Sequence, residues 1–322
     1  MLPPKNQLTI CFAHAAYQMQ ACFNDRNTGI RSFELRERAE LDRRIGEADV
    51  LLVSGMWHNG LIPTAGRLRF IQSISSGTDQ YDKAALAKHG IRLASAQGVN
   101  ARAVAEHALA LMLALARRLP EARDNQVRRV WRGMIGDLTQ REDELGGKTL
   151  LVIGLGRIGM RLAQLAKAFD MRVIGFRRDV SSGAGAADEV HTLAELPRFL
   201  PQADFVALTC ALTEETRGVI DAQALAALPH SAFLVNCARG GCVDEPALVG
   251  ALQAGRIAGA ALDVTDPEPP SAESPLWAMP NVLITPHTAG ETRKYEANVI
   301  DILLENLDRL WRGESGLRNQ VV

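Results

Sequence analysis

The six residues from Gly154 to Gly159, with the sequence GLGRIG, have the glycine spacing of a backbone turn that binds a diphosphate. The first glycine permits a tight turn, the second lets the backbone approach the phosphates, and the third lets a helix pack against a strand. The N-terminus of that helix would supply unpaired N–H groups and the positive end of a helix dipole. The pattern alone is weakly specific, because the chain has 27 glycines among 322 residues.

The residues around these glycines make the prediction more specific. From Lys148 to Arg178 the order is apolar strand, glycine-rich turn, helix and second strand, as in a dinucleotide-binding fingerprint. The second strand ends in Arg177 and Arg178, where an NAD site usually places a carboxylate for the ribose. Two cations there favour the 2′-phosphate of NADP(H). The alternative is that both arginines are solvated and Asp179 binds the ribose of NAD(H).

Three polar side chains lie shortly after other apolar runs, namely Arg239, Glu268 and His287. The preceding runs are expected strands at Ala232–Ala238, Gly259–Val264 and Asn281–Pro286. In an open parallel sheet, ligands bind outside the carboxyl ends of the strands. Each residue alone has an ordinary alternative, as a surface cation, a solvated carboxylate or a satisfied loop histidine. Their coincidence at strand ends beside the glycine turn favours a functional site.

The elements that would position these residues alternate along the chain. In the first hundred residues we expect strands at Leu8–Ala13, Asp49–Ser54, Leu68–Ser75 and Ile91–Ala96. Helical segments are expected near Arg31–Ile45 and Lys83–His89. A long helix from about Asn100 to Leu119 follows, in which Glu106 and His107 are expected to be a buried pair. The polar segment from Glu121 to Gly147 has no clear period and is expected to be partly irregular.

The second half is expected to hold six strands, with Asp204–Cys210 completing the set. The helices between them are expected at Thr192–Leu200, Ala222–Leu228 and Glu245–Ala254, with a final helix from about Glu291 to Arg312. Apolar strands alternating with helices predict an α/β fold with doubly wound parallel sheets. The length of 322 residues favours two domains.

Composition excludes several classes of protein. The net charge of −1 gives no field that would attract nucleic acid or an anionic membrane. The most apolar helix is too short and too polar to span a bilayer, and the N-terminus lacks the features of a signal peptide. The five cysteines fit no metal-binding spacing, so we expect reduced, packed thiols and no metal. A cytosolic protein is expected.

Seven ordered segments resemble one protein family. From about Leu68 to Arg293 the chain is similar to the D-isomer-specific 2-hydroxyacid dehydrogenases, especially their glyoxylate/hydroxypyruvate reductase branch. Besides the fingerprint, the matching segments are Ser75–Asp82, Val99–Arg118, Leu212–Ile220, Asn236–Leu248, Ala261–Pro270 and Asn281–Thr292.

The resemblance implies that Arg239, Glu268 and His287 are catalytic. Reduction of a 2-oxo acid needs a hydride at the carbonyl carbon and a proton at its oxygen. An imidazole titrates near neutrality and can give that proton, while a carboxylate on its other nitrogen fixes the tautomer. A guanidinium can grip the substrate carboxylate.

The fingerprint and the resemblance together imply two sets of contacts. Cofactor contacts are expected from Gly154, Gly156, Arg157, Ile158, Gly159, Arg177, Arg178, Cys210, Thr216, Cys237, Ala238, Arg239, Asp263 and His287. Substrate contacts are expected from Ser76, Gly77, Thr78, Arg239 and His287. Asp263 matches the position that contacts the nicotinamide, and Trp57 and His58 could line the substrate site.

The resemblance also implies an architecture. A flavodoxin-like substrate domain would comprise residues 1–100 and 288–322, and a Rossmann cofactor domain residues 101–287, with the active site in a cleft between them. A homodimer is expected, with its contact in residues 100–147.

The expected activity is reduction of a small 2-oxo acid, such as glyoxylate or hydroxypyruvate, to the D-2-hydroxy acid with NADP(H), or less favourably NAD(H). Two alternatives stay open. One is a nicotinamide-sensing interaction protein on the same scaffold, and the other is a dehydrogenase of another small acid.

Overall fold

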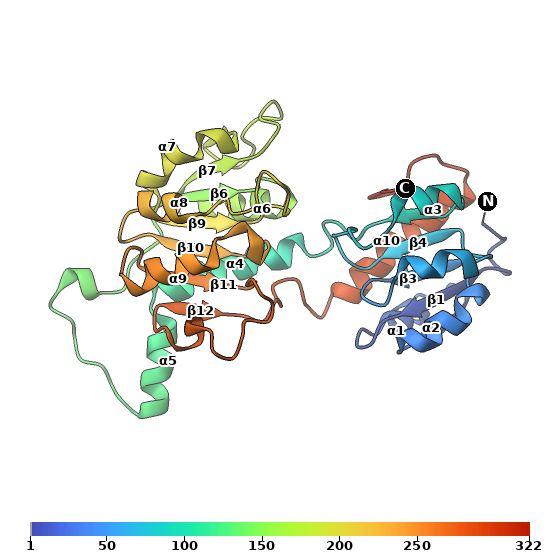
Figure 1. Cartoon of the computed structure of the whole chain (residues 1–322), viewed down its shortest axis with the longest axis horizontal. Coiled ribbons are helices and arrows are strands. Elements are labelled where there is room, and N and C mark those ends of the chain that lie inside the picture. Colours follow the sequence, from blue (N-terminus) through green and yellow to red (C-terminus); the bar gives the residue numbers. More distant parts are fainter. Residues whose placement is uncertain (1) are drawn as a thin grey trace. The chain divides into compact units, whose positions relative to one another are not determined.

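The computed structural model describes residues 2–322, apart from the side chain of Thr139. The chain divides into two compact units. One comprises the residues up to Asn100 together with Thr292–Val322, and the other comprises Ala101–Glu291. Each unit is built around one parallel β-sheet, as the alternation of apolar runs and helices predicts (Figure 1).

The first unit has a five-stranded sheet in the order β2-β1-β3-β4-β5. The strands are β1 (Thr9–Ala13), β2 (Arg31–Leu35), β3 (Val50–Val53), β4 (Phe70–Ser73) and β5 (Arg92–Ala94). The helices are α1 (Met19–Asn24), α2 (Arg38–Arg44), α3 (Lys83–Lys88) and α10 (Tyr295–Trp311). Alternate residues of β1 enter two apolar clusters, with Ile10 and Phe12 in one and Cys11 and Ala13 in the other. The sheet is therefore covered on both faces, as expected for a doubly wound fold.

The predicted helix over Arg31–Ile45 is wrong in its first part. Arg31–Leu35 is the strand β2, which pairs in parallel with β1, and the helix α2 begins only at Arg38. Four of the five residues of β2 are at least partly exposed, because β2 lies at the edge of the sheet. Its sequence, RSFEL, therefore lacks the continuous apolar run that marks a central strand.

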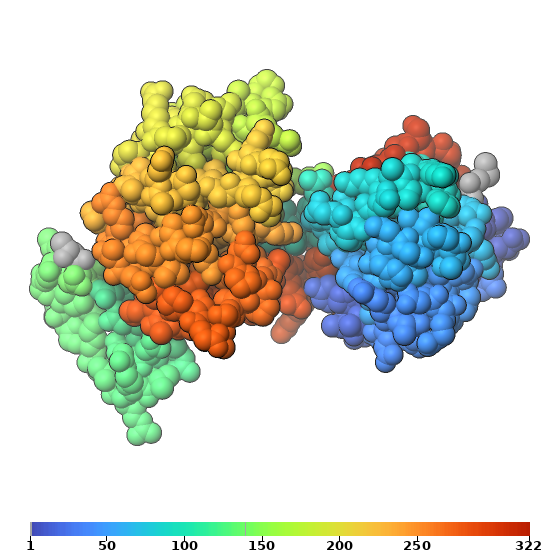
Figure 2. All heavy atoms as spheres, in the orientation of Figure 1, coloured from blue at the N-terminus to red at the C-terminus, as the bar shows by residue number. Residues whose placement is uncertain are grey.

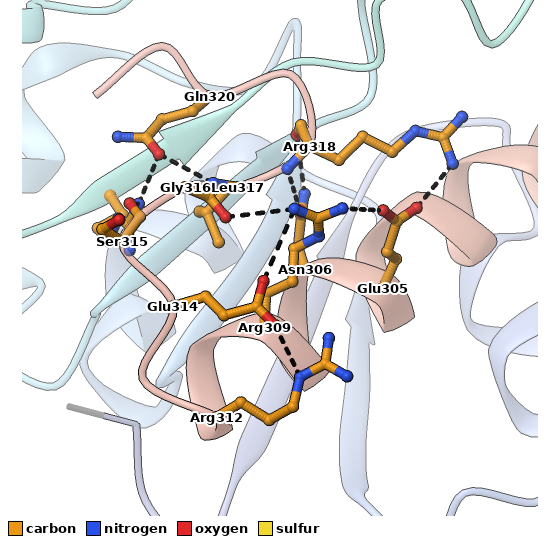
Figure 3. A network of polar contacts seen from close by, with 11 residues as sticks. Glu305, Asn306, Arg309, Arg312, Glu314, Ser315, Gly316, Leu317, Arg318 and Gln320 are labelled. Atoms are coloured by element: carbon orange, nitrogen blue, oxygen red, sulfur yellow. Dashed lines mark hydrogen bonds and ion pairs between the residues drawn. The ribbon is translucent and has the colours of Figure 1, made fainter.

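The C-terminal segment is fixed to this sheet through α10. The buried Asn306 donates from Nδ2 to Gln72 Oε1 of β4, at 3.0 Å, and its Oδ1 accepts from the backbone N–H of Arg318, at 2.7 Å. Arg318 also pairs with Glu305 (Figure 3). The Tyr295 hydroxyl donates to the carbonyl of Ile74, just after β4. These contacts fix the carboxyl end of β4, where a predicted substrate-binding turn begins.

The second unit has a seven-stranded sheet in the order β12-β11-β10-β9-β6-β7-β8. The strands are β6 (Thr149–Ile153), β7 (Arg172–Phe176), β8 (Glu189–His191), β9 (Phe205–Leu208), β10 (Phe233–Asn236), β11 (Gly259–Leu262) and β12 (Val282–Ile284). Strand β8 was not among the six predicted. It is a partly exposed edge strand of three residues, EVH, and has no apolar run.

The helices of this unit include α4 (Ala101–Ala116), α6 (Arg157–Lys167), α7 (Leu196–Phe199), α8 (Ala222–Ala227) and α9 (Glu245–Gln253). Alternate residues of β6 enter two clusters, Leu150 and Val152 with α4 and α6, and Leu151 and Ile153 with α8 and α9. The strand order reverses between β6 and β9. Ligands bind in such sheets at this topological switch point. Among residues 2–322, none of the helices has the length and hydropathy needed to cross a lipid bilayer.

The segment expected to be partly irregular contains a further helix, α5 (Leu119–Arg128). None of its residues is buried, so no apolar period marks it in the sequence. The segment from Leu119 to Leu138 exposes six large apolar side chains, namely Leu119, Val127, Val130, Trp131, Met134 and Leu138. Figure 2 shows this segment, in green, standing out from the rest of its unit.

Candidate active site

The glycine-rich turn follows β6 at the switch point, and its three glycines have three different surroundings. Gly154 has φ +99°, and a Cβ there would lie 2.5 Å from Cys210 Cα. A Cβ on Gly159 would lie 2.4 Å from the carbonyl oxygen of Gly154, so only glycine lets α6 approach the turn. A Cβ on Gly156 would meet nothing within 4 Å. The backbone at Gly156 is thus open to a ligand.

Unpaired donors lie beside this opening. Gly156 is the N-cap of α6, and no side chain caps the helix. In residues 2–322, the backbone N–H groups of Ile158 and Gly159 have no hydrogen-bond acceptor. Such amides at a helix N-terminus bind phosphate oxygens. The turn therefore fits the diphosphate of a dinucleotide.

Two cations follow β7. Arg178 is exposed, and Arg177 is half-buried and donates from Nη2 to the carbonyl of Gly183, at 2.5 Å. Arg177 Nε is buried and has no partner in the described part of the chain. Asp179 is occupied within its own loop, since it accepts from Ser181 N, Ser181 Oγ and Ser182 Oγ. The hydrogen bond from the Ser181 hydroxyl is the main reason why the pKa of Asp179 is lowered.

Four other predicted cofactor contacts lie at the carboxyl ends of β9 and β10 or in the loop that follows β9. Cys210 lies against Gly154, and its Sγ is 3.9 Å from Cys242 Sγ. Cys237 and Ala238 are buried, and burial raises the pKa of the Cys237 thiol to about 12. The Thr216 hydroxyl donates to the carbonyl of Ala211, at 2.7 Å, so it orders its own loop. All five cysteines are free thiols.

Glu268 and His287, 19 residues apart, are brought together by the ends of β11 and β12. His287 Nδ1 lies 2.6 Å from Glu268 Oε1, and both side chains are nearly half exposed. Because Glu268 uses Nδ1, the other ring nitrogen, Nε2, is left to face a ligand. His287 has a left-handed backbone, with φ 55°, which is uncommon for a residue other than glycine.

Arg239 lies on the same sheet edge, just after β10, and is exposed. Asn236 holds this turn by accepting from Ala238 N and donating to the carbonyl of Arg239, both at 3.0 Å. Gly240 permits a close approach to the loop after β11, because a Cβ there would lie 1.9 Å from the carbonyl oxygen of Thr265. In the described residues, the guanidinium donates to its neighbour Ala238 and touches neither Glu268 nor His287.

Asp263, directly after β11, is buried, and its oxygens face backbone and hydroxyl donors. Oδ1 accepts from Thr285 Oγ1 at 2.6 Å and from Thr288 N at 3.0 Å, and Oδ2 accepts from Ala289 N at 3.1 Å. His107 Nε2 lies 3.0 Å from Thr285 Oγ1 and 3.6 Å from Asp263 Oδ1. The sequence did not point to Thr285. The expectation of a buried Glu106–His107 pair is wrong, because Glu106 is exposed on α4 and His107 is only partly buried.

In the first unit, the predicted substrate turn follows β4. Over the residues that the structure describes, the backbone N–H groups of Ser76, Gly77 and Thr78 have no acceptor. Three unpaired N–H groups in one turn suit a carboxylate. The Ser75 hydroxyl fixes the turn by donating to the carbonyl of Gly77, at 3.0 Å.

The predicted role of Trp57 in lining a substrate site is not supported. Its side chain is buried in the core of the first unit, and the ring packs against Tyr81 with centroids 5.5 Å apart. Its indole N–H donates to Asn59 Oδ1, at 3.0 Å. His58 is exposed and pairs with Asp42, at 2.7 Å. An apolar residue after a strand can thus complete a core, which its sequence position does not reveal.

Comparison with known proteins identifies the family. The model of the D-isomer specific 2-hydroxyacid dehydrogenase, NAD binding domain, matches residues 109–289, more than half of the chain. The chain belongs to this family. The match spans the glycine-rich turn, both arginines after β7 and the three strand-end residues, so this chain carries the NAD binding domain of its family.

Relatives and solved structures agree with the family. The chain is 38% identical over 278 residues to the glyoxylate reductase of Aeropyrum pernix, which covers 83% of this chain and 81% of the relative. It is 36% identical over 280 residues to a D-3-phosphoglycerate dehydrogenase of Methanocaldococcus jannaschii, over 86% of this chain. This chain spans only about half of that longer relative, 52%. A crystal structure of a Thermus thermophilus protein, 33% identical, superposes with a TM-score of 0.84 over 97% of this chain and 100% of the other.

Proposed function

We propose that this dehydrogenase reduces a small 2-oxo acid to the D-2-hydroxy acid with a nicotinamide cofactor. The observation that carries the proposal is the 2.6 Å contact between His287 Nδ1 and Glu268 Oε1, on the sheet edge that also holds the glycine-rich turn. This pair places one imidazole nitrogen on a carboxylate and leaves the other for a reacting oxygen.

The chain's own residues have separate tasks in this mechanism. The reduced nicotinamide, when bound, supplies a hydride to the carbonyl carbon of the substrate. His287 gives a proton from Nε2 to the carbonyl oxygen, while Glu268 holds Nδ1–H and stabilises the protonated ring. Arg239 offers a planar pair of donors to the substrate carboxylate. In the first unit, the free amides of Ser76, Gly77 and Thr78 are assigned to substrate binding.

NADP(H) is proposed as the preferred form of the cofactor, with NAD(H) possible. Arg178 is exposed and Arg177 is half-buried beside it, so two positive charges follow β7 and can attract a 2′-phosphate. Asp179 is turned to Ser181 and Ser182, which removes the carboxylate that would otherwise accept from a ribose hydroxyl.

The two compact units are given separate roles. We assign cofactor binding to Ala101–Glu291, which contains the residues matched by the family model, and substrate binding to the other unit. The cytosolic location stays a prediction.

The proposed substrate class is glyoxylate or hydroxypyruvate. A phosphorylated acid is a second candidate, because relatives include D-3-phosphoglycerate dehydrogenases and Arg38 Nη2 donates to the carbonyl of Gly55, at 2.7 Å, in the loop after β3. That arginine could meet a phosphate.

We expect kcat/KM for reduction of glyoxylate or hydroxypyruvate with NADPH to be at least tenfold higher than kcat/KM for oxidation of D-3-phosphoglycerate with NADP⁺. Absorbance of the reduced cofactor measures both rates, with a panel of 2-oxo acids in one direction and D-3-phosphoglycerate in the other. Preference for the phosphorylated acid would support the second candidate. No turnover with any acid, despite cofactor binding, would instead favour a nicotinamide-sensing interaction protein.

A homodimer through the segment from Leu119 to Leu138 is also proposed. Trp131 and Met134 are fully exposed in the single chain, and α5 buries no residue. Six large apolar side chains in one segment mark an interaction surface. A second copy is the proposed occupant, because the family resemblance implies a dimer formed by this region.

Sedimentation equilibrium should give twice the chain mass of 35.0 kDa at micromolar concentration. The double variant Trp131→Arg with Met134→Glu should sediment as a monomer, since charges replace the centre of the apolar surface. Trp277→Arg is the matched control, because Trp277 is 55% exposed outside this segment, and it should stay dimeric. A monomeric parent protein would refute the proposed interface.

A further inference from the structure

Asp263 accepts hydrogen bonds from three successive backbone amides, those of residues 287–289. Its carbonyl oxygen accepts from His287 N at 2.8 Å, its Oδ1 from Thr288 N at 3.0 Å and its Oδ2 from Ala289 N at 3.1 Å. The first of these amides belongs to His287, the residue with the left-handed backbone. Since that conformation is unfavourable for histidine, the surrounding contacts must enforce it.

The hydrogen bonds that join His107 of α4, Thr285 and Asp263 can run in only one direction. A carboxylate can only accept, so the single hydroxyl proton of Thr285 goes to Asp263 Oδ1, at 2.6 Å. The Thr285 oxygen must then accept from His107, whose Nε2 is 3.0 Å away. His107 therefore carries its proton on Nε2. The chain of donors runs from His107 through Thr285 to Asp263, and His107 Nε2 also lies 3.6 Å from Asp263 Oδ1.

This chain links two elements that are far apart in sequence. His107 lies on α4, which packs against α6 and against β10 and β11 in the apolar core of the unit. Thr285 and Asp263 follow β12 and β11. Asp263 is 3% exposed, so each of its hydrogen bonds is shielded from water and a missing donor would not be replaced by solvent.

We propose that His107, Thr285 and Asp263 are positioning residues, which hold the backbone of residues 287–289 so that His287 meets Glu268. The inference rests on the proposed function, in which His287 gives the proton. None of the three needs to touch the substrate. Asp263 then acts through the backbone of His287, a role separate from the nicotinamide contact that the family resemblance implies.

The test compares Thr285→Val with Thr285→Ser. Valine keeps the shape but removes the hydroxyl, so we expect kcat to fall about tenfold with KM for the 2-oxo acid within twofold. The proton transfer should also become more rate-limiting, which a larger solvent deuterium isotope effect on kcat would show. Serine keeps the hydroxyl and should recover most of kcat.

Controls separate positioning from general loss of stability. Thr192→Val removes a hydroxyl that donates to Glu195 Oε2, at 3.2 Å, elsewhere in the unit, so it should lower the thermal midpoint and leave kcat unchanged. If Thr285→Val does not fold, His107→Gln and His107→Leu replace the pair, because glutamine retains a donor and leucine does not. Glutamine should then keep several times the kcat of leucine.

Two results would overturn the inference, namely kcat of Thr285→Val within twofold of the parent, or equal defects in the serine and valine variants. These outcomes differ from failure of the proposed function. If His287→Asn is inactive while Thr285→Val is normal, only the positioning role fails. If His287→Asn is itself fully active, the assignment of His287 as proton donor fails first.

Discussion

Replacement of His287 with asparagine is expected to lower kcat for 2-oxo acid reduction by about a hundredfold to ten-thousandfold, the usual contribution of a positioned general acid. Asparagine is the sharpest substitution here. Its amide nitrogen mimics Nδ1 and can still donate to Glu268, while the proton-giving Nε2 is absent. Asparagine also tolerates the left-handed backbone found at φ 55°. The loss should therefore report the missing proton donor.

Steady-state absorbance of NADPH gives kcat, and fluorescence titration of NADPH should show unchanged binding. His230→Asn is the matched control. His230 precedes β10 and so lies at the amino edge of the sheet, where its Nδ1 contacts the carbonyl of Gly255, at 3.1 Å. That variant should keep parental activity. An activity of His287→Asn within about threefold of the parent would remove His287 from the mechanism.

Replacement of Arg178 with alanine is expected to lower kcat/KM for NADPH by about tenfold to a hundredfold. The physical reason is the loss of a charge-assisted hydrogen bond to the 2′-phosphate, typically ~1.5–3 kcal/mol. NADH has no such phosphate, so its kcat/KM should change by less than twofold. The measurement with NADH is therefore the control for NADPH in the same variant. The quantity to measure is the ratio of kcat/KM for NADPH to kcat/KM for NADH.

Arg198→Ala tests whether the loss of any positive charge changes the cofactor preference, since Arg198 is an exposed arginine on α7 of the same unit. It should leave the NADPH to NADH ratio unchanged. An equal loss with both cofactors in Arg178→Ala would indicate a structural role for Arg178. A parental ratio below one would reverse the proposed preference for NADPH.

The central strands could be predicted from sequence, and the edge strands could not. Strands such as Thr149–Ile153 are buried on both faces and give continuous apolar runs. Strands β2 and β8 lie at sheet edges, are partly exposed and carry polar residues. Helix α5 escaped prediction for a related reason, because no face of it packs on the core.

The candidate site could be predicted in part. The order of strands in a parallel sheet implies that Glu268 and His287 lie on one edge, and the structure brings their side chains to 2.6 Å. The left-handed turn at His287 and the bond from His107 to Thr285 could not be foreseen. They depend on how α4 packs against β10 and β11, and no local pattern encodes a contact between residues 178 positions apart.

The strand order of the second sheet has a consequence for how members of this family could diverge. Strand β7, with the two arginines after it, lies on one side of the reversal between β6 and β9. Strands β10, β11 and β12, with the proposed proton donor and its supports, lie on the other. Substitutions that alter which nicotinamide coenzyme is accepted therefore need not disturb the acid–base residues. Coenzyme preference and acid–base chemistry can therefore change independently within the same fold.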